Sequence, residues 1–389
     1  MLKNEKILFY LSSLLILLLP FYLLRFNVLG IPSTFLEISI YLVFLTFVAW
    51  FFINKKNITL KKLIFSLLLL FISIIDSCLA LDKNSSFGQT KAFFFDGLLV
   101  VILIQILFEN YKENFFNYIF KSYLFVSVIL AIWGILQKLG LVGLFGHQKV
   151  DPMLANQLSQ GRILGPFESP NYLAMFILPA AIMLFVNYFE NYIKFKKEWF
   201  YIIFSILIIA LFFTQSIASL LTLLITVVIY CYLKLPKLKY LVVTALLFFV
   251  LALSALIVSG RIDKIDSAKS RIEIYKAGIN IGSKHNFFGI GLGNFNSYYG
   301  EYIKSVPNRM NWEALHPHNL FLNFWVSMGL PGLFVFIIMV CLIFNKKNFQ
   351  NKKIFIFPLI AILFNGLLDT AFFKNDLAII FWLFYALLI

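Results

Sequence analysis

Long apolar runs separated by short polar segments recur along nearly the whole chain, and this pattern limits the possible folds more than any other feature. A helix needs about 20 mostly apolar residues to cross a bilayer. We expect twelve such spans, at residues 7–26, 35–53, 62–80, 92–108, 119–139, 171–189, 198–213, 217–233, 240–259, 318–343, 354–372 and 377–389. The seventh and eighth form one apolar block that is too long for a single helix, so Thr214-Gln215-Ser216 predicts a tight hairpin.

The composition agrees with this pattern. The chain is 61% hydrophobic and 13% charged, whereas soluble domains are about 45–50% apolar and about 25% charged. The start of the chain, Lys3 and Lys6 before an apolar run, resembles a signal peptide, but no small-residue cleavage site follows it, so we expect an uncleaved first helix. The sequence therefore predicts an all-α polytopic integral membrane protein, with one transmembrane domain of about 12 helices over residues 1–389.

Basic residues orient these spans. With the N-terminus in the cytoplasm, eighteen lysines fall in short inside segments and four basic residues fall in short outside segments. This distribution follows the positive-inside rule. The net charge of +15 therefore indicates contact with anionic membrane lipids, and no separate basic domain suggests nucleic acid. The three cysteines, Cys78, Cys231 and Cys341, have no spacing typical of a zinc site or a disulfide framework.

Two longer polar segments, 140–170 and 260–317, both fall on the outside. They contain four of the five arginines, namely Arg162, Arg261, Arg271 and Arg309. Arginine presents a planar fork of donors suited to phosphate oxygens. These two segments, the second a large periplasmic loop before the tenth helix, are therefore where we expect the functional site.

The stretch HPHNLFLNFWVSMGLPG, residues 316–332, places two histidines at the edge of the tenth span. We expect His318 to open this helix and to share a face with Leu322, Trp325 and Gly329, with Asn319 on a neighbouring polar stripe. A histidine at this depth can also simply contact lipid headgroups. His316 and His318 could chelate a metal together only on extended backbone, and no acidic or cysteine cluster completes a ligand set.

Two motifs precede this helix. SRIEIYKAGINI, residues 270–281, has helical periodicity with Arg271, Tyr275 and Gly278 on one side. It is either a helix lying on the membrane surface or one that aims an arginine at a phosphate. GIGLGNF, residues 289–295, lacks the spacing of a dinucleotide fingerprint and predicts a tight turn.

A third motif and two carboxylates complete the inventory. GRILGPFESPN, residues 161–171, leads into the sixth span and offers Arg162 as a phosphate ligand or a headgroup contact. Asp96 and Asp369 lie near the outer ends of apolar spans, where carboxylates need partners. Lys91 and Lys374 are their nearest cations in sequence, so simple ion pairs are one interpretation and functional roles are the other.

Together these pieces resemble the O-antigen ligase and polymerase family of polytopic bacterial membrane glycosyltransferases, over roughly residues 160–372. The resemblance rests on residues 316–336 with His318 and Gly329, on SRIEIYKAGI with Arg271 followed by GIGLGNF, and on GRILGPFESPN. It implies a GT-C-like fold in the bacterial inner membrane, with an active site that faces the periplasm and serves cell-envelope polysaccharide or lipopolysaccharide biosynthesis.

The resemblance also implies the chemistry. The donor would be a glycan on undecaprenyl diphosphate, and the acceptor a sugar hydroxyl on lipid A–core or on a growing chain. His318 would be the general base and Arg271 would hold the diphosphate, with no cofactor and no metal. The substrate-binding candidates are Arg162, Asn171, Tyr275, His316 and Asn319.

One position departs from the family. The family commonly has an arginine just after a Thr-x-Ser piece, and Ile217 stands there in this chain. A second diphosphate ligand is therefore missing or replaced, with Arg162 the nearest candidate. Three functions remain open at this point: ligase, surface polysaccharide polymerase and, in another class, a polysaccharide or lipid transporter, although transporters usually show repeated halves and broken helices near mid-membrane.

Overall fold

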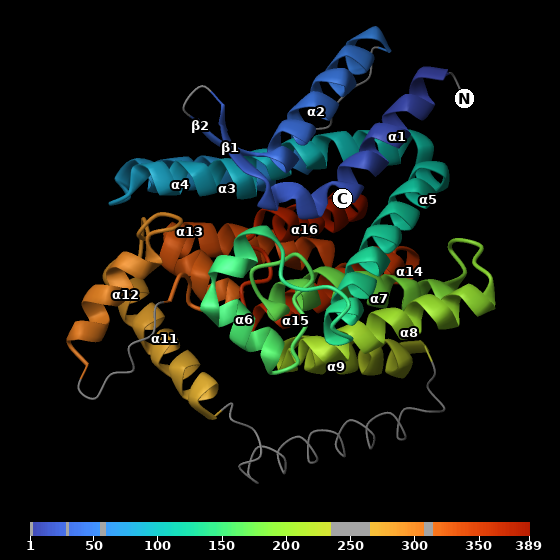
Figure 1. The fold of residues 1–389 in the computed structure, drawn as a ribbon. Coiled ribbons are helices and arrows are strands. Elements are labelled where there is room, and N and C mark those ends of the chain that lie inside the picture. Colours follow the sequence, from blue (N-terminus) through green and yellow to red (C-terminus); the bar gives the residue numbers. More distant parts are fainter. Residues whose placement is uncertain (1–2, 29–30, 55–59, 235–264, 307–313) are drawn as a thin grey trace.

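The structure is a computed structural model that describes residues 3–28, 31–54, 60–234, 265–306 and 314–389. It is 79% helical and 2% strand, which confirms the predicted all-α class (Figure 1). The elements are α1 (Lys3–Leu17), the 3-10 helix η1 (Leu19–Leu23), β1 (Arg25–Val28), β2 (Ile31–Thr34), α2 (Phe35–Ile53), α3 (Leu60–Leu79), α4 (Lys83–Thr90), the π-helical turn η2 (Lys91–Phe95), α5 (Asp96–Lys138), η3 (Gly146–Val150), α6 (Pro152–Ser159), α7 (Pro170–Glu190), α8 (Lys197–Thr214), α9 (Ile217–Lys234), α11 (Ile265–Lys284), α12 (Phe295–Lys304), α13 (Leu320–Ile343), α14 (Lys346–Asn351), α15 (Lys353–Gly366) and α16 (Asn375–Leu388).

Eight helices of the described part of the chain are long and apolar enough to span a membrane. Three shorter apolar helices, Lys6–Leu17, Lys353–Gly366 and Asn375–Leu388, correspond to the predicted first, eleventh and twelfth spans. The predicted span 240–259 lies outside the described residues, so the total of twelve stays a prediction. The chain is a polytopic membrane protein.

Several predicted spans have different ends in the structure. The first helix stops at Leu17, because Pro20 lacks the amide hydrogen that would continue it. The 3-10 helix η1 begins at Leu19, and an antiparallel pair of strands, β1 and β2, follows. The fourth and fifth spans are separate helices, at Lys83–Lys112 and Asn114–Lys138, and within α5 the backbone leaves the helical conformation between them at Lys112 (φ 40°). The predicted hairpin is confirmed: α8 ends at Thr214, Gln215 adopts a left-handed conformation, and α9 begins at Ile217.

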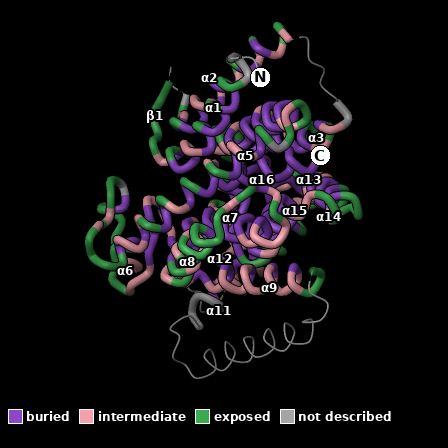
Figure 2. Tube along the Cα trace, turned by 90° about the vertical axis from the view of Figure 1, so that its right-hand side faces the viewer, coloured by how far each residue is buried: buried purple, intermediate pink, exposed green. Residues whose placement is uncertain are grey.

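The centre of the bundle is formed by α7, α15 and α16, whose residues are mostly buried (Figure 2). α15 packs against α7, and α16 packs against α5, where Gly97 lets the Trp382 ring approach the backbone. The outer helices expose many large apolar side chains, such as Leu42 and Phe52 on α2. In lipid this exposure is not costly, so close packing of small and aromatic groups, rather than exclusion of water, holds such helices together.

The segment before α13 is built around the backbone of that helix. The predicted turn GIGLGNF is confirmed, since Gly289, Gly291 and Gly293 all have positive φ. The amides of Ile290 and Gly291 bond to carbonyl groups of α13. The helical conformation of α13 is interrupted at Gly329 (φ 63°). The backbone of Phe287 lies where a side chain at this position would stand, so only glycine fits here. This close approach fixes the loop, and α11 beside it, against the start of α13.

Candidate functional site

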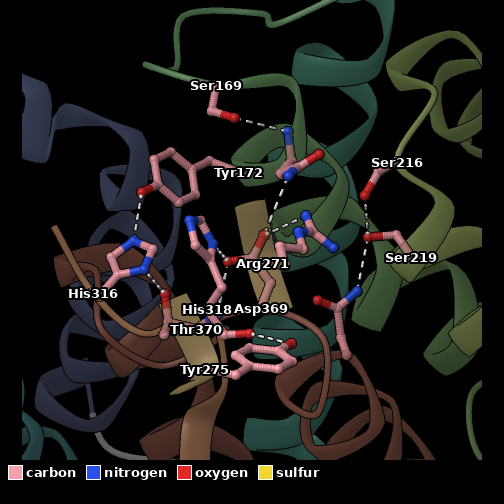
Figure 3. A network of polar contacts seen from close by, with 12 residues as sticks. Ser169, Tyr172, Ser216, Ser219, Arg271, Tyr275, His316, His318, Asp369 and Thr370 are labelled. Carbon is pink, nitrogen blue, oxygen red and sulfur yellow. Dashed lines mark hydrogen bonds and ion pairs between the residues drawn. The ribbon is translucent and has the colours of Figure 1, made fainter. Parts of the chain in front are cut away.

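Four segments meet where α13 begins, and together they form a polar network (Figure 3). They are the residues just before α13, the middle of α11, the loop between α15 and α16, and the loop that leads into α7. These segments are far apart in sequence, and the fold brings them together. The network contains all seven of the candidate residues named from the sequence.

His318 lies before α13 rather than inside it. The helix begins at Leu320, Asn319 caps it by accepting a hydrogen bond from the Leu322 amide (2.9 Å), and His318 has a left-handed conformation (φ 47°). The prediction that His318 shares a helix face with Leu322, Trp325 and Gly329 is therefore wrong. The reason is that Asn319, as the N-cap, satisfies a free amide of the first turn, so the helix begins only after the histidine.

The ring of His318 is paired with a carboxylate. Its Nδ1 lies 3.1 Å from Oδ1 of Asp369, which also accepts from the Thr370 amide (2.8 Å). A carboxylate only accepts hydrogen bonds, so Nδ1 must carry the proton and Nε2 of a neutral ring is left with its lone pair. The histidine side chain is 29% exposed, so its free edge is accessible.

Asp369 has other partners than the one that its place in the sequence suggested. The predicted pairing with Lys374 does not form, since Lys374 bonds to Glu168 and Asp369 lies in the loop after α15. Burial alone would raise the pKa of Asp369, but the hydrogen bond from His318 and the nearby His318, His316 and Arg271 hold that pKa below its ordinary value. Asp369 is therefore a carboxylate at every pH near neutrality.

Two guanidinium groups lie beside this pair. Arg271 on α11 has a terminal nitrogen 3.9 Å from Oδ2 of Asp369. Arg162 donates to the Thr214 carbonyl (3.1 Å) and to Oδ1 of Asn171 (3.2 Å). Burial and the positive charge of Arg271 lower the pKa of Arg162, which reflects two cations held close together. An anion placed between them would relieve that repulsion.

The position of Arg162 bears on the unusual Ile217. Arg162 bonds to the carbonyl of Thr214, which ends α8 three residues before Ile217 begins α9. The guanidinium from the loop before α7 thus reaches the same turn where the family arginine would begin its side chain.

The remaining candidates position the charged groups. Asn171, one residue into α7, donates to Oδ2 of Asp369 (3.2 Å) while accepting from Arg162. The Tyr275 hydroxyl donates to the backbone carbonyl of His318 (3.1 Å), and the Asn319 amide donates to the Leu367 carbonyl (2.9 Å). These bonds join α7, α11 and the α15–α16 loop to the histidine segment. As predicted, Arg271, Tyr275 and Gly278 face one side of α11, while Ile272 and Ile279 are exposed.

His316 differs from His318 in its surroundings. Its ring nitrogens lie 3.4 Å from the Tyr172 hydroxyl and 3.3 Å from the Thr370 hydroxyl, so both have neutral partners. Burial and the charges of His318 and Lys374 lower the pKa of His316 to about 3. His316 is therefore neutral at physiological pH and packs edge-on against the His318 ring, with 4.6 Å between centroids.

The described residues also offer a group that can hold a metal ion. Ligand atoms of His316, His318 and Asp369 lie within 4.8 Å of one another. No carboxylate near the two histidines in sequence indicated such a set, because Asp369 comes from a distant loop. Two imidazoles and a carboxylate suit zinc, but the ion would occupy the same atoms that join His318 to Asp369. Of the other cations noted in the large loop, Arg261 and Arg309 lie outside the described residues.

Comparison with known proteins supports one family. A family model described as O-antigen ligase matches residues 202–337. The matched region contains Arg271, Tyr275, His316, His318 and Asn319. Arg162, Asn171 and Asp369 lie outside it and join those residues only in the folded chain. A search of curated proteins found no match. The match supports the resemblance stated above: residues 202–337 of this polytopic membrane protein are similar to the O-antigen ligase family.

Proposed function

We propose that this protein transfers a glycan from undecaprenyl diphosphate to a sugar hydroxyl, such as one on lipid A–core, at the periplasmic face of the bacterial inner membrane. The family supports O-antigen ligase or polymerase activity in the broad sense. The observation that carries the specific proposal is the His318–Asp369 pair standing beside Arg271 and Arg162.

His318 acts as the general base. Asp369 holds the proton on Nδ1, so Nε2 can accept the proton of the acceptor hydroxyl as that oxygen attacks the anomeric carbon. Histidine suits this role because its charge changes near neutral pH. Asp369 also stabilises the positive ring that forms, in the way a buried carboxylate does in a catalytic triad.

The arginines act on the departing group. As the new glycosidic bond forms, the bond between the anomeric carbon and the phosphate oxygen breaks, and lipid diphosphate leaves with the electron pair. Arg271 and Arg162 offer fixed donors to the charge that develops on that diphosphate. Because diphosphate is a good leaving group, no carboxylic acid has to protonate it, unlike glycoside hydrolysis with two carboxylates. A single displacement predicts inversion at the anomeric carbon.

The proposed reaction needs no nucleotide or metal, since histidine supplies the base and arginine the positive charge. A polymerase would use the same donor and the same residues with a lipid-linked chain as acceptor. A transporter would instead place its binding groups near mid-membrane, whereas these residues lie on α11 and at one end of α7, α13 and α15. The geometry therefore favours transfer over transport.

The proposal is tested with detergent-purified protein, an undecaprenyl-diphosphate glycan and three candidate acceptors: lipid A–core, a lipid-linked glycan and water alone. We expect His318→Ala to lose transfer by about 10²–10⁴-fold while remaining folded, and a chelator to leave the wild-type rate unchanged. His285→Ala is the matched control, because His285 lies in the same large loop but packs on Tyr298 instead.

Each arm can overturn a separate part of the proposal. Full activity in the His318→Ala protein would reject the assigned base. A product that forms only on a lipid-linked chain would identify a polymerase. Movement of labelled lipid across liposomes without any transfer would identify a transporter.

A further inference from the structure

A cavity lies at the other ends of the helices that carry the candidate site. It has a volume of about 310 Å³ and is lined by residues at the end of α13, in α14, at the start of α15 and at the end of α16, together with α3. The histidine segment precedes α13 and the Asp369 loop lies between α15 and α16, so the two sites are separated by the length of α13. At about 1.5 Å per residue, its 24 residues span roughly 36 Å.

The polar wall of this cavity is basic. Lys62, Lys347 and Lys352 line it together with the side-chain amides of Asn345 and Asn348. Among the described residues, Lys62 forms an ion pair with Glu109. Three lysine side chains therefore line one cavity, and Glu109 pairs with one of them.

Lys352 shows the consequence of this excess charge. Its ammonium donates to the carbonyl groups of Leu387 and Leu388 (3.1 and 2.9 Å), which keeps the side chain in the cavity wall. Burial and the charges of Lys62 and Lys347 lower the pKa of Lys352 to about 8. A bound anion would stabilise the charged ammonium of Lys352. It would take the place of the water lost on burial, and its negative charge would offset the repulsion from Lys62 and Lys347.

The other wall is apolar and reaches the lipid. Phe65 on α3 and Met339 and Leu342 on α13 line the same cavity, and Leu342 is 57% exposed. A free phosphate ion would contact only the lysines and asparagines. A phospholipid would use both walls, with its phosphate on the lysines and its acyl chains along the exposed apolar surface.

We propose that this cavity binds the headgroup of an anionic phospholipid of the surrounding membrane. Clusters of lysine between membrane helices on the cytoplasmic side are typical of such sites, and the expected orientation of the chain places this end in the cytoplasm. The volume lies at the lower end of the range for ligand pockets, which fits a phosphodiester headgroup whose chains remain in the bilayer. The bound lipid fixes the ends of α3, α13 and α16 relative to one another.

Adjacent lysines provide the matched variants. Lys347 lines this cavity, whereas Lys346 lines a separate, larger cavity beside α9. Purified protein is titrated with phosphatidylglycerol or phosphatidylcholine, and bound lipid is counted by native mass spectrometry. Since one lysine near an anionic headgroup contributes about 1 kcal/mol, we expect Lys347→Gln to weaken phosphatidylglycerol binding about fivefold. Lys347→Gln with Lys352→Gln should weaken it further, and Lys346→Gln should leave it unchanged.

The alternatives give different results. Equal retention of phosphatidylcholine and phosphatidylglycerol by the wild-type protein, or equal losses in Lys346→Gln and Lys347→Gln, would overturn the proposal. Competition by inorganic phosphate at millimolar concentration, with no preference among lipids, would assign the cavity to a free anion instead. Melting temperatures of the variants in detergent without lipid show whether they are folded. Because the readout is lipid retention, failure here leaves the proposed glycan transfer untouched.

Discussion

The two ends of α13, α15 and α16 carry cations of different kinds, and the difference indicates what each end can do. At the end with His318, the Arg162 guanidinium and the Asp369 carboxylate are held by directed hydrogen bonds, and Arg271 lies 3.9 Å from the same carboxylate. At the other end, three lysines line a cavity; Lys352 bonds to two backbone carbonyls and Lys62 pairs with Glu109. Arginine forks fix the orientation of a phosphate, whereas lysine acts as a compact point charge. This difference fits the two proposals, that one end positions a reacting group and that the other holds a lipid headgroup.

After the loss of His318, substitution of Asp369 should lower the transfer rate most. It tests whether the orientation of the His318 ring matters, and not only the charge at this end. Asp369→Asn keeps the shape but removes the acceptor that holds the His318 proton on Nδ1. We expect the turnover number to fall by about 10²–10³-fold with little change in donor KM, because the interaction acts mainly in the transition state. Asp151→Asn, at the cap of α6, is the control. An unchanged turnover number in Asp369→Asn would show that the pair only supports the loop.

The arginines test whether geometry or charge matters at this end. Arg271→Lys and Arg162→Lys keep the positive charge but lose the planar fork. We expect each to lower the rate of transfer by about tenfold, and each alanine variant by about 10²-fold, measured by product formation at saturating acceptor. If Arg162→Ala retained the wild-type rate, Arg162 would not replace the cation missing at Ile217.

The neutral state of His316 in the folded protein predicts how the free energy of unfolding depends on pH. The pKa of His316 is lowered to about 3 in the folded protein, against about 6.5 for an ordinary histidine. Between these values the unfolded chain binds the extra proton, so the free energy of unfolding falls as pH decreases, by at most about 1.4 kcal/mol per pH unit. Above this window the residue contributes no pH dependence.

Melting temperatures at pH 7 and pH 5 measure this effect. His316→Asn removes the titrating ring, so its melting temperature should fall less between these pH values than that of the wild type. An identical fall in both proteins would show that the His316 ring is protonated in the folded state.

The smallest effect on transfer is expected from the lysine end. Lys347→Gln changes the lipid cavity but lies the length of α13 away from His318. We expect the transfer rate in detergent to stay within about twofold of the wild type, since exposed charges this far apart are screened by salt. A tenfold fall in that rate would show that the two ends are coupled.

Some parts of the site were predictable from sequence and others were not. His318, Arg271 and Tyr275 lie in the motifs that carry the resemblance to the O-antigen ligase family, and the structure places these residues together. Asp369 could not be paired with His318, because the partners are 51 residues apart and Lys374 was the nearer cation in sequence. The only available signal was a carboxylate at the outer end of an apolar span.

By itself, the sequence determined the membrane class of the protein, most of its spans and the separation of lysine from arginine. These properties are local, because the length of an apolar run and the charges beside it act without distant contacts. Tertiary structure decided that Phe287 breaks α13 at Gly329, that Arg162 reaches the turn before Ile217 and that Asp369 holds His318. Those choices depend on the packing of distant segments, which no local pattern of residues encodes.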